Sequence, residues 1–314
     1  VLAVPRVFEK VYNSAEQKAS DGGKEKIFRW AAKQAIDYSK GLDTEKGPSL
    51  AVKARHAIAM RLVLNRIVAA LGGNARHAVS GSAPLGERLS HFYRGIGVQV
   101  LEGYGLTETN AASHVNLPEH SKIGTVGPPL PGIEVRIAGD GEVLMRGEQL
   151  FEGYHRNPDA TKEAIVDGWF HTGDIGAEDE DGYLTITGRK KELIVTAGGK
   201  NVAPAELEDA IRSYVLVSQC VVVGDAQPFI AALITLDAEA LPAWLESKDL
   251  EPMSPAEAAK DERVLARIQK AVDRANGAVA RAESVRTFRI LDDDLTIENG
   301  MLTPSMKVKR ARVL

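Results

Sequence analysis

The spacing of apolar residues changes twice along this chain, and each change marks a different kind of structure. From Ser14 to about Leu71 apolar residues recur with the period of an α-helix, and Gly72-Gly73 ends that pattern. Short apolar runs at 75–79 and 98–101 then flank a helical stretch at 87–94. This strand-helix-strand order predicts an α/β fold with part of a parallel sheet, whose ligands bind at the carboxyl ends of the strands.

A β pattern follows over residues 124–188. Apolar and polar residues alternate over Ile133–Ile137, and Asp140-Gly141 separates this run from a second one at Glu142–Arg146. Asp-Gly between two alternating runs is a strong hairpin signal. A second Asp-Gly pair, Asp181-Gly182, precedes another alternating run. We therefore predict a compact β subdomain over about 124–188.

A third pattern begins after Arg189 and predicts a small α+β unit. The expected strands are 192–196, 217–223, 229–236 and 285–291, and the expected helices begin at Pro204 and cover about 255–280. Pro at a helix start suits the first turn, where its missing N–H is not needed. A chain of 314 residues has room for two domains. We place them at 1–188, an incomplete large domain, and 189–314, a small C-terminal domain.

Composition excludes several classes of protein. The net charge of -4 provides no overall field for a polyanion, so we expect no nucleic-acid partner. The single cysteine, Cys220, lies in an apolar run and has no cysteine to pair with, which favours a reducing cytoplasm. No run reaches the roughly 18 apolar residues that cross a bilayer. Val1–Lys10 lacks the features of a signal peptide and an initiator Met, so we expect a fragment.

Glycine-rich segments near predicted strand ends occur in a fixed order along the chain. They are Ser80–Leu85 (SGSAPL), Glu102–Thr109 (EGYGLTET), His171–Asp174 (HTGD) and Gly188–Ile194 (GRKKELI). With the terminal Leu302–Arg310 (LTPSMKVKR), this set resembles the adenylate-forming superfamily of acyl-CoA ligases, luciferases and peptide-synthetase adenylation domains over nearly the whole chain. The opening Val4–Tyr12 and the long helical region before Ser80 are most similar to long-chain fatty acyl-CoA ligases.

The resemblance implies a reaction in two steps. A fatty acid and ATP, with Mg²⁺, give an acyl-adenylate and pyrophosphate, and CoA then displaces AMP to give acyl-CoA. The resemblance also implies that the small domain is mobile and swings about a hinge at Lys191. ATP, AMP, Mg²⁺, CoA and a fatty acid are therefore the expected ligands.

The resemblance places the nucleotide beside several of the glycine-rich segments. Glycine lets a planar ring approach the backbone because no Cβ is in the way. The residues implied around the nucleotide and the acyl group are Gly81, Ser82, Ala83, Gly103, Tyr104, Gly105, Asp174 and Arg189. Tyr104 offers a flat face for adenine, while Asp174 and Arg189 suit the ribose hydroxyls. Taken alone, Tyr104 is explained as a core residue beside a tight turn, and Asp174 as the cap of its own turn.

Thr107 and Glu108 combine a hydroxyl with a hard carboxylate. This combination suits a phosphate oxygen and the Mg²⁺ ion that accompanies it. The resemblance gives both residues that role, so Glu108 is the predicted metal ligand. The alternative is that Thr107 and Glu108 begin a helix, where an early carboxylate is common.

Three further positions lie just after the domain boundary. The resemblance makes Lys191 the hinge, and Gly198 and Gly199 the wall of a tunnel for the pantetheine arm of CoA. A strand-to-helix turn would use the same glycines. We interpret Lys190 as an exposed basic residue at the junction.

Lys307 is the strongest candidate for chemistry. Attack of a carboxylate on the α-phosphate brings negative oxygens together, and an ammonium group between them lowers that cost as charge shifts in the transition state. The resemblance places the catalytic lysine on a mobile C-terminal loop at this position. Many members have Gly before that lysine, whereas this chain has Met306. A basic tail without catalytic function is the alternative.

One element of the resembling enzymes has no counterpart here. They carry an upstream Ser/Thr/Gly-rich loop ending in Pro-Lys-Gly that holds the β and γ phosphates, and neither this loop nor a Walker-type loop occurs in the chain. We expect the chain alone to be defective in adenylation. The alternatives are an acyl-AMP ligase, a peptide-synthetase adenylation domain, and a non-catalytic truncated nucleotide-binding protein. The uninterrupted segment Arg189–Asn201 favours CoA as the acceptor.

Basic and apolar residues are mixed in the helical region from Lys53 to Arg66. Such a mixture suits a peripheral contact between a cytoplasmic protein and a membrane surface. Packing against the large domain is the alternative that we favour from the sequence.

Overall fold

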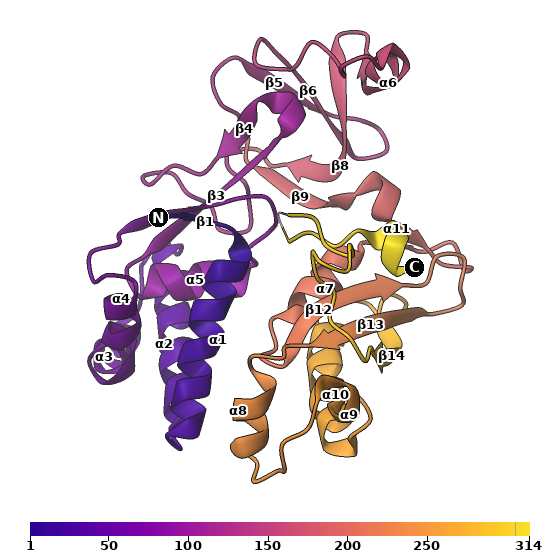
Figure 1. Ribbon diagram of the computed structural model, residues 1–314. Coiled ribbons are helices and arrows are strands. Elements are labelled where there is room, and N and C mark those ends of the chain that lie inside the picture. The colour runs from indigo at the N-terminus through magenta and orange to yellow at the C-terminus, as the bar shows by residue number, and fades with distance from the viewer. Residues whose placement is uncertain (305) are drawn as a thin grey trace. The chain divides into compact units, whose positions relative to one another are not determined.

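The computed structural model describes residues 1–304 and 306–314 and divides the chain into two compact units, Val1–Lys190 and Lys191–Leu314 (Figure 1). Each unit has its own buried apolar cluster. Within the described residues, none of the helices combines the length and the apolar character needed to cross a bilayer.

The first unit opens with a layer of helices rather than one long helix. These are α1 (Pro5–Asp21), α2 (Glu25–Leu42), α3 (Leu50–Ala59), a π-helical turn (Met60–Leu64) and α4 (Asn65–Ala70). The prediction of continuous helical structure from Ser14 to Leu71 was wrong at two points. Gly23 adopts a φ of +67° after α1, and Pro48 follows α2, so the chain turns at both places.

The helices cover a four-stranded sheet in the order β1 (Leu2–Ala3), β2 (His77–Ser80), β3 (Gln99–Leu106) and β4 (Ala111–Val115). β1, β2 and β3 are parallel, and α5 (Glu87–Gly95) connects β2 to β3, which confirms the predicted strand-helix-strand unit. β4 runs antiparallel to β3 and was not predicted.

Pairing with β4 also corrects the predicted turn at 102–109. Residues up to Leu106 belong to β3, and only Thr107–Thr109 leave the strand, in a short 3₁₀ turn. Gly103, Tyr104 and Gly105 are therefore strand residues. Extended backbone has unpaired N–H and C=O groups, and β4 provides the partners that the sequence did not reveal.

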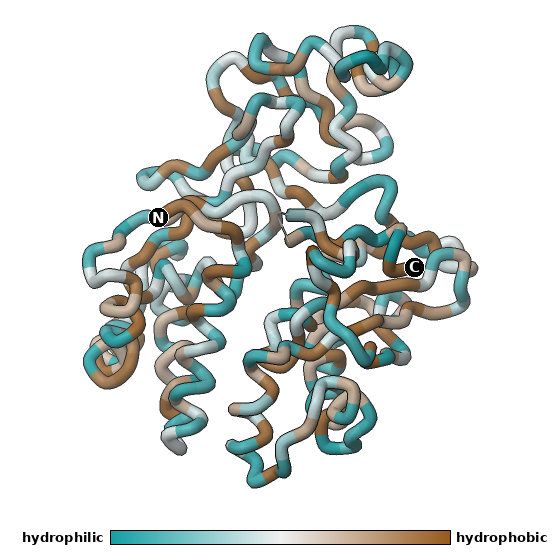
Figure 2. Tube along the Cα trace, viewed as in Figure 1, coloured by the Kyte–Doolittle hydropathy of each residue, from teal (hydrophilic) through white to brown (hydrophobic). Residues whose placement is uncertain are grey.

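Aromatic rings pack between the helices of the first unit. Tyr12 meets the rings of Phe28 and Phe92 edge to face, with centroids 5.4 and 4.8 Å apart. The buried Tyr93 hydroxyl donates a hydrogen bond of 2.7 Å to the carbonyl of Phe8. Apolar and polar residues alternate along α1 and α2, as the change between brown and teal in Figure 2 shows, so each helix has one face for this core.

The β subdomain of the first unit contains five strands. They are β5 (Ile133–Ile137), β6 (Glu142–Gly147), β7 (Ile165–Val166), β8 (Trp169–Glu178) and β9 (Leu184–Arg189), with α6 (Pro158–Ala164) preceding β7. The order is β5-β6-β8-β7, with β9 also paired to β8. The hairpin predicted at Asp140-Gly141 is confirmed, and Asp181-Gly182 lies between the antiparallel strands β8 and β9. His171–Asp174 lies inside β8, however, and not in a turn as predicted.

The second unit is built on the sheet β12 (Val217–Val223), β13 (Ile230–Leu236) and β14 (Val285–Ile290). Around it lie a hairpin of β10 (Ile194–Val195) and β11 (Asn201–Val202) and the helices α7 (Pro204–Arg212), α8 (Leu241–Glu246), α9 (Pro255–Ala258), α10 (Glu262–Asn276) and α11 (Arg310–Val313). The predicted helix 255–280 is two helices, because Asp261 caps the start of α10. Cys220 is buried in β12, and burial raises the pKa of its thiol, so it is a core residue.

A test of the helix packing in the first unit uses Gly95. A Cβ at this position would lie 2.1 Å from the backbone oxygen of Ala35 on α2. We expect Gly95→Ala to destabilise the chain by about 2 kcal/mol or more, because α5 must move away from α2. Urea unfolding followed by circular dichroism measures the change.

Gly139→Ala is the matched control, because a Cβ there would meet open space. Its free energy of unfolding should stay within about 0.5 kcal/mol of the parent. Equal stabilities for both variants would contradict the packing of α5 on α2.

Candidate active site

Three predicted nucleotide residues come together at the buried carboxylate of Asp174. The Tyr104 hydroxyl on β3 donates a hydrogen bond of 2.5 Å to Asp174 Oδ2 on β8. Arg189 Nε, at the end of β9, lies 2.9 Å from Asp174 Oδ1. The Asp174 residue is 3% exposed, whereas the Arg189 side chain is 52% exposed. The structure thus brings the three residues into direct contact, with the carboxylate inside and the guanidinium at the surface.

The electrostatics of this group fix which partner carries the proton. Burial raises the pKa of Tyr104, and the negative charge of Asp174 raises it further. The phenol therefore stays protonated and donates to the carboxylate at any physiological pH. Thr172 supports the arrangement, because its Oγ1 accepts a hydrogen bond of 3.0 Å from the Asp174 N–H.

The glycines of β3 lie directly against the backbone of β4. A Cβ on Gly105 would lie 1.9 Å from the Ala111 oxygen, and one on Gly103 would lie 3.1 Å from the His114 oxygen, both on β4. At Gly81 the nearest atom would be the Gly103 oxygen, at 3.4 Å. We expected glycine at these positions because a nucleotide ring lies against the backbone. At Gly105 the protein itself gives another reason, because β4 leaves no room for a side chain.

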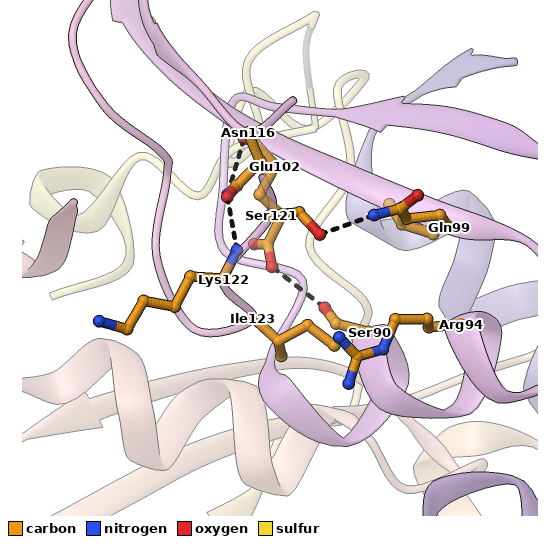
Figure 3. A pocket seen from close by; sticks show the side chains of 9 residues that line it. Ser90, Arg94, Gln99, Glu102, Asn116, Ser121, Lys122 and Ile123 are labelled. Atoms are coloured by element: carbon orange, nitrogen blue, oxygen red, sulfur yellow. Dashed lines mark hydrogen bonds between the residues drawn. The ribbon is translucent and has the colours of Figure 1, made fainter. Parts of the chain in front are cut away.

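The loop that carries Gly81, Ser82 and Ala83 is fastened to β3 through Glu102. Leu85 N donates to Glu102 Oε2 at 2.9 Å, and Ser90 Oγ donates to Oε1 at 3.0 Å (Figure 3). Ser82 is exposed and has a φ of +75°, an uncommon conformation outside glycine. The cavity beside Glu102 has a volume of about 10 Å³. That is the size of one water molecule, so it is no nucleotide pocket.

Thr107 and Glu108 lie in the 3₁₀ turn after β3. The alternative prediction, that they begin a helix, holds only for this single turn. Thr109 fixes the turn, because its hydroxyl accepts from Leu106 N at 2.8 Å and donates to the Ala111 oxygen at 2.7 Å. Glu108 Oε1 accepts a hydrogen bond of 2.8 Å from the Tyr154 hydroxyl.

Glu108 is the predicted ligand of Mg²⁺. Among the described residues, no group of three or more His, Cys, Asp or Glu side chains forms a ready-made metal site. Mg²⁺ often binds through one or two carboxylates together with substrate phosphates, and a single half-exposed carboxylate such as Glu108 fits that mode.

Lys190 proves to be more than an exposed basic residue. Its ammonium lies 2.6 Å from Asp140 Oδ2 and 2.9 Å from Glu142 Oε2, both in the β subdomain. Glu142 is buried and also contacts His171 Nδ1 at 3.2 Å. Burial alone would raise the pKa of Glu142, but the hydrogen bonds from Lys190 and His171 outweigh it and the pKa is lowered. Lys190 thus anchors the end of the first unit, and the exposed Lys191 begins the second.

A pH-dependent stability test follows from Glu142. Its folded pKa lies below the unfolded value, so its contribution is present above the unfolded pKa and is lost as pH falls through the folded pKa. We expect Lys190→Met to lower the free energy of unfolding at pH 7 by about 1–2 kcal/mol, because the buried carboxylate loses its cation. The deficit should shrink once the pH falls below about 4. Urea unfolding at several pH values measures it.

The exposed Lys162 on α6 provides the control. Lys162→Met should change stability by less than about 0.5 kcal/mol at either pH. A deficit in Lys190→Met that is the same at pH 7 and pH 3.5 would contradict the role of Glu142.

The predicted CoA segment forms the tip of the β10–β11 hairpin, not a strand-to-helix turn. Thr196 Oγ1 accepts from Lys200 N at 3.1 Å, and Gly199 N donates to the Thr196 oxygen at 2.8 Å. Gly199 has a φ of +75°, which explains its glycine, whereas a Cβ on Gly198 would meet only Thr196 Oγ1 at 3.9 Å. Lys200 Nζ pairs with Glu283 at 2.9 Å. A Cβ on Gly199 would meet no atom within 4 Å.

Lys307 lies exposed on a short loop of the second unit. Thr303 N donates to the Lys307 oxygen at 2.8 Å, and Lys307 N donates to Thr303 Oγ1 at 3.0 Å. Leu302 and Val308 form an isolated antiparallel β-bridge beside them. Met306 has a φ of +63°. This left-handed conformation costs about 1–2 kcal/mol outside glycine. Ser305 lies outside the described residues.

Several contacts around these residues were not foreseen from the sequence. Tyr154 reaches Glu108 from 46 residues away, and no local pattern marks it. Thr109 has a signal in the sequence, because it is a third polar residue directly after Thr107 and Glu108. A groove of about 810 Å³ lies in the second unit. Three separate segments of the chain line it, and they include Lys191, Phe229 and Leu314.

Comparison with known protein families agrees with this geometry. A model described as AMP-binding enzyme matches residues 1–155, and one described as AMP-binding enzyme C-terminal domain matches residues 191–314. The chain belongs to the AMP-binding enzyme family. The second match begins at Lys191, where the second compact unit also begins.

Curated members of the AMP-binding enzyme family match the whole chain. The long-chain-fatty-acid–CoA ligase FadD15 of Mycobacterium tuberculosis is 57% identical over 311 residues, which are 99% of this chain and 52% of that protein. The human long-chain-fatty-acid–CoA ligase ACSBG1 is 33% identical over 340 residues, covering 100% of this chain and 46% of that protein. The chain therefore spans about half the length of these relatives.

Solved structures of the same family share the fold. The adenylation domain of a carboxylate reductase from Mycobacterium chelonae has a TM-score of 0.70 at 24% identity, covering 100% of this chain and 44% of that chain. The A domain of a carboxylic acid reductase from Segniliparus rugosus, in complex with AMP and a co-purified carboxylic acid, also has a TM-score of 0.70 at 24% identity, covering 99% and 44%. At this identity the likeness shows the fold alone, which agrees with the α/β class predicted above.

Proposed function

We propose that this chain serves in an ATP-dependent long-chain fatty acid:CoA ligase. The observation that carries the proposal is the contact of Asp174 with Arg189, its cross-strand partner in the β8–β9 hairpin, and with Tyr104, 70 residues earlier in the sequence. The chain that holds this contact is 57% identical to a long-chain-fatty-acid–CoA ligase. The proposed reaction forms an acyl-adenylate and pyrophosphate from fatty acid and ATP, then acyl-CoA and AMP.

The chemistry of the Asp174 group suits a nucleoside. A buried carboxylate beside an exposed guanidinium can accept hydrogen bonds from ribose hydroxyls while the positive charge balances it. The Tyr104 phenol holds one carboxylate oxygen in place, so the acceptor is preorganised. On this proposal Gly81, Ser82 and Ala83 border the adenine and the acyl group, and Glu108 with Thr107 holds Mg²⁺ and the phosphate.

Lys307 is the proposed catalytic residue of the adenylation step. Its ammonium is exposed, and both backbone groups of Lys307 bond to Thr303, so the loop presents the side chain to solvent. An exposed ammonium can approach the phosphate oxygens and stabilise the charge that develops there. Lys191 is the proposed hinge between the two units, and the hairpin tip with Gly198 and Gly199 the proposed contact for the pantetheine arm of CoA.

The test separates the two half-reactions in the longest natural protein that contains this chain. We expect Lys307→Ala to lower the rate of acyl-adenylate formation by about 100-fold or more, since it removes a charge that acts in the transition state. It should still convert supplied acyl-adenylate and CoA to the thioester. Lys191→Pro should show the opposite pattern. Pyrophosphate release and thioester formation are the two measurements.

Equal loss of both half-reactions in Lys307→Ala would contradict the role of Lys307, and an unaffected thioester step in Lys191→Pro would contradict the hinge. Absence of CoA-dependent AMP release by the parent would favour transfer to a carrier protein.

The chain by itself should bind an acyl-adenylate analogue in calorimetry but form no adenylate, because no phosphate loop occurs in its sequence. Adenylate formation by the chain alone would contradict that expectation.

The proposed fatty-acid substrate gives a reason for contact with a membrane surface. Residues 50–70 contain four basic residues and no acidic one, and Lys53, Arg55, Arg61 and Arg66 are all exposed. Between them Leu50, Ile58 and Leu62 are 84%, 51% and 56% exposed. The opposite face, with Ala59, Leu64 and Ile67, is buried in the first unit. Packing against the domain therefore occupies one face, and we propose an anionic lipid surface for the other.

Binding to lipid vesicles tests this face. We expect Ile58→Asp to weaken sedimentation with vesicles of phosphatidylglycerol and phosphatidylcholine about 10-fold, because it removes apolar contact and adds a negative charge. Ile27→Asp on α2 is the control, since Ile27 is 48% exposed but belongs to another helix. Equal binding to neutral and anionic vesicles, or an equal effect of both variants, would contradict the proposal.

A further inference from the structure

The tail that carries Lys307 is fastened to the second unit by an ion pair that the reaction chemistry does not explain. Arg310 Nη1 contacts Glu208 Oε1 of α7 at 2.5 Å, and the two side chains are 16% and 14% exposed. Arg310 Nη2 also donates to the backbone oxygen of Val222 on β12. The pair is therefore partly buried, and the arginine holds two different elements at once.

Glu208 also bonds to the backbone of Val222, as Arg310 does. Its Oε1 accepts a hydrogen bond of 2.7 Å from the Val222 N–H. β12 is the outer strand of the sheet β12-β13-β14, so its outward backbone groups have no neighbouring strand. Glu208 and Arg310 supply the acceptor and the donor that such a strand would have provided at Val222. Loss of either side chain leaves a buried backbone group and a charge without a partner.

Arg310 stands three residues after Lys307, at the base of its loop. The loop is closed by the Leu302–Val308 bridge and by the hydrogen bond of 2.8 Å from Lys309 N to the Met301 oxygen. Leu302 and Val308 pack with Val221 and Val313 in a small apolar cluster. α11 has only four residues and cannot hold the tail by itself.

We propose that Glu208 and Arg310 are positioning residues that set the direction of the Lys307 loop on the second unit. This inference rests on the proposed function for its effect on catalysis, but not for its effect on the loop. Both side chains are engaged by each other and by the backbone of Val222. The pair fixes the chain three residues after Lys307, directly behind the Leu302–Val308 bridge that closes the loop, so a displacement at Arg310 moves Lys307.

The first experiment measures the loop in this chain, without any substrate. Amide hydrogen exchange in Arg310→Ala and Glu208→Ala should become about 10-fold faster over residues 301–309, because the loop opens more often. Exchange in β13 should not change. Arg310→Lys keeps a charge but offers a single donor group, so its exchange should be intermediate and its fold intact. Arg289→Ala, at an exposed arginine of β14, is the control. Unchanged exchange over 301–309 in Arg310→Ala would overturn the proposal.

The second experiment measures catalysis in the longest natural protein that contains the chain. Arg310→Ala should slow acyl-adenylate formation by about 10- to 100-fold through misplacement of Lys307. The KM for the fatty acid and the thioester step from supplied acyl-adenylate should stay unchanged. The double variant Glu208→Ala/Arg310→Ala should be no slower than Arg310→Ala, because the two residues act as one unit.

The two experiments separate the possible failures. If Lys307→Ala itself leaves adenylation intact, the proposed role of Lys307 fails, while hydrogen exchange still decides whether the pair holds the loop. If exchange rises in Arg310→Ala but adenylation does not fall although Lys307→Ala abolishes it, the positioning role is overturned. A uniform loss of both half-reactions in Arg310→Lys would likewise overturn it, because that pattern indicates general instability.

Discussion

The carboxylate of Asp174 is a buried negative charge on which contacts from two sheets of the first unit converge. A carboxylate that is 3% exposed is costly unless hydrogen bonds and a positive charge compensate it. Tyr104 provides the hydrogen bond from the parallel-sheet region, and Arg189 provides the charge from the last strand of the β subdomain. The same three residues that suit a nucleoside therefore also join two sheets of the unit. A substitution of Tyr104, Asp174 or Arg189 should therefore be tested for its effect on nucleotide binding and for its effect on the stability of the fold.

The backbone of β3 leaves little room for side chains at its glycines, because β4 lies against it. Gly105 has the Ala111 backbone directly against it, and Thr109 uses its hydroxyl to turn the chain from β3 into β4. Thr107 and Glu108 are placed by this turn, and Tyr154 contacts Glu108 from a later segment. The glycines of the segment thus have a structural reason that is independent of any ligand. A nucleotide would use a surface whose shape the two strands already fix.

The boundary at residues 190 and 191 has an anchor on the side of the first unit. Lys190 ends the first unit with ion pairs to Asp140 and Glu142, and the second unit begins at the exposed Lys191. Lys190 is thus held by two carboxylates of its own unit, and Lys191 is exposed. The hinge proposed at Lys191 directly follows this fixed residue. The sequence alone had suggested only an exposed basic cluster at Lys190.

The amino-acid sequence by itself determined the local structure and the family resemblance. Periodicity located the parallel strand-helix-strand unit, the Asp-Gly hairpins and the strand around Cys220, because these depend on neighbouring residues. The tertiary structure alone decided what depends on distant partners. Pairing with β4 made Gly103 to Leu106 a strand, Tyr154 reached Glu108, and Arg310 found Glu208 across 102 residues. Such contacts leave no pattern in a single sequence, since the partner of a polar group is chosen by packing and not by spacing along the chain.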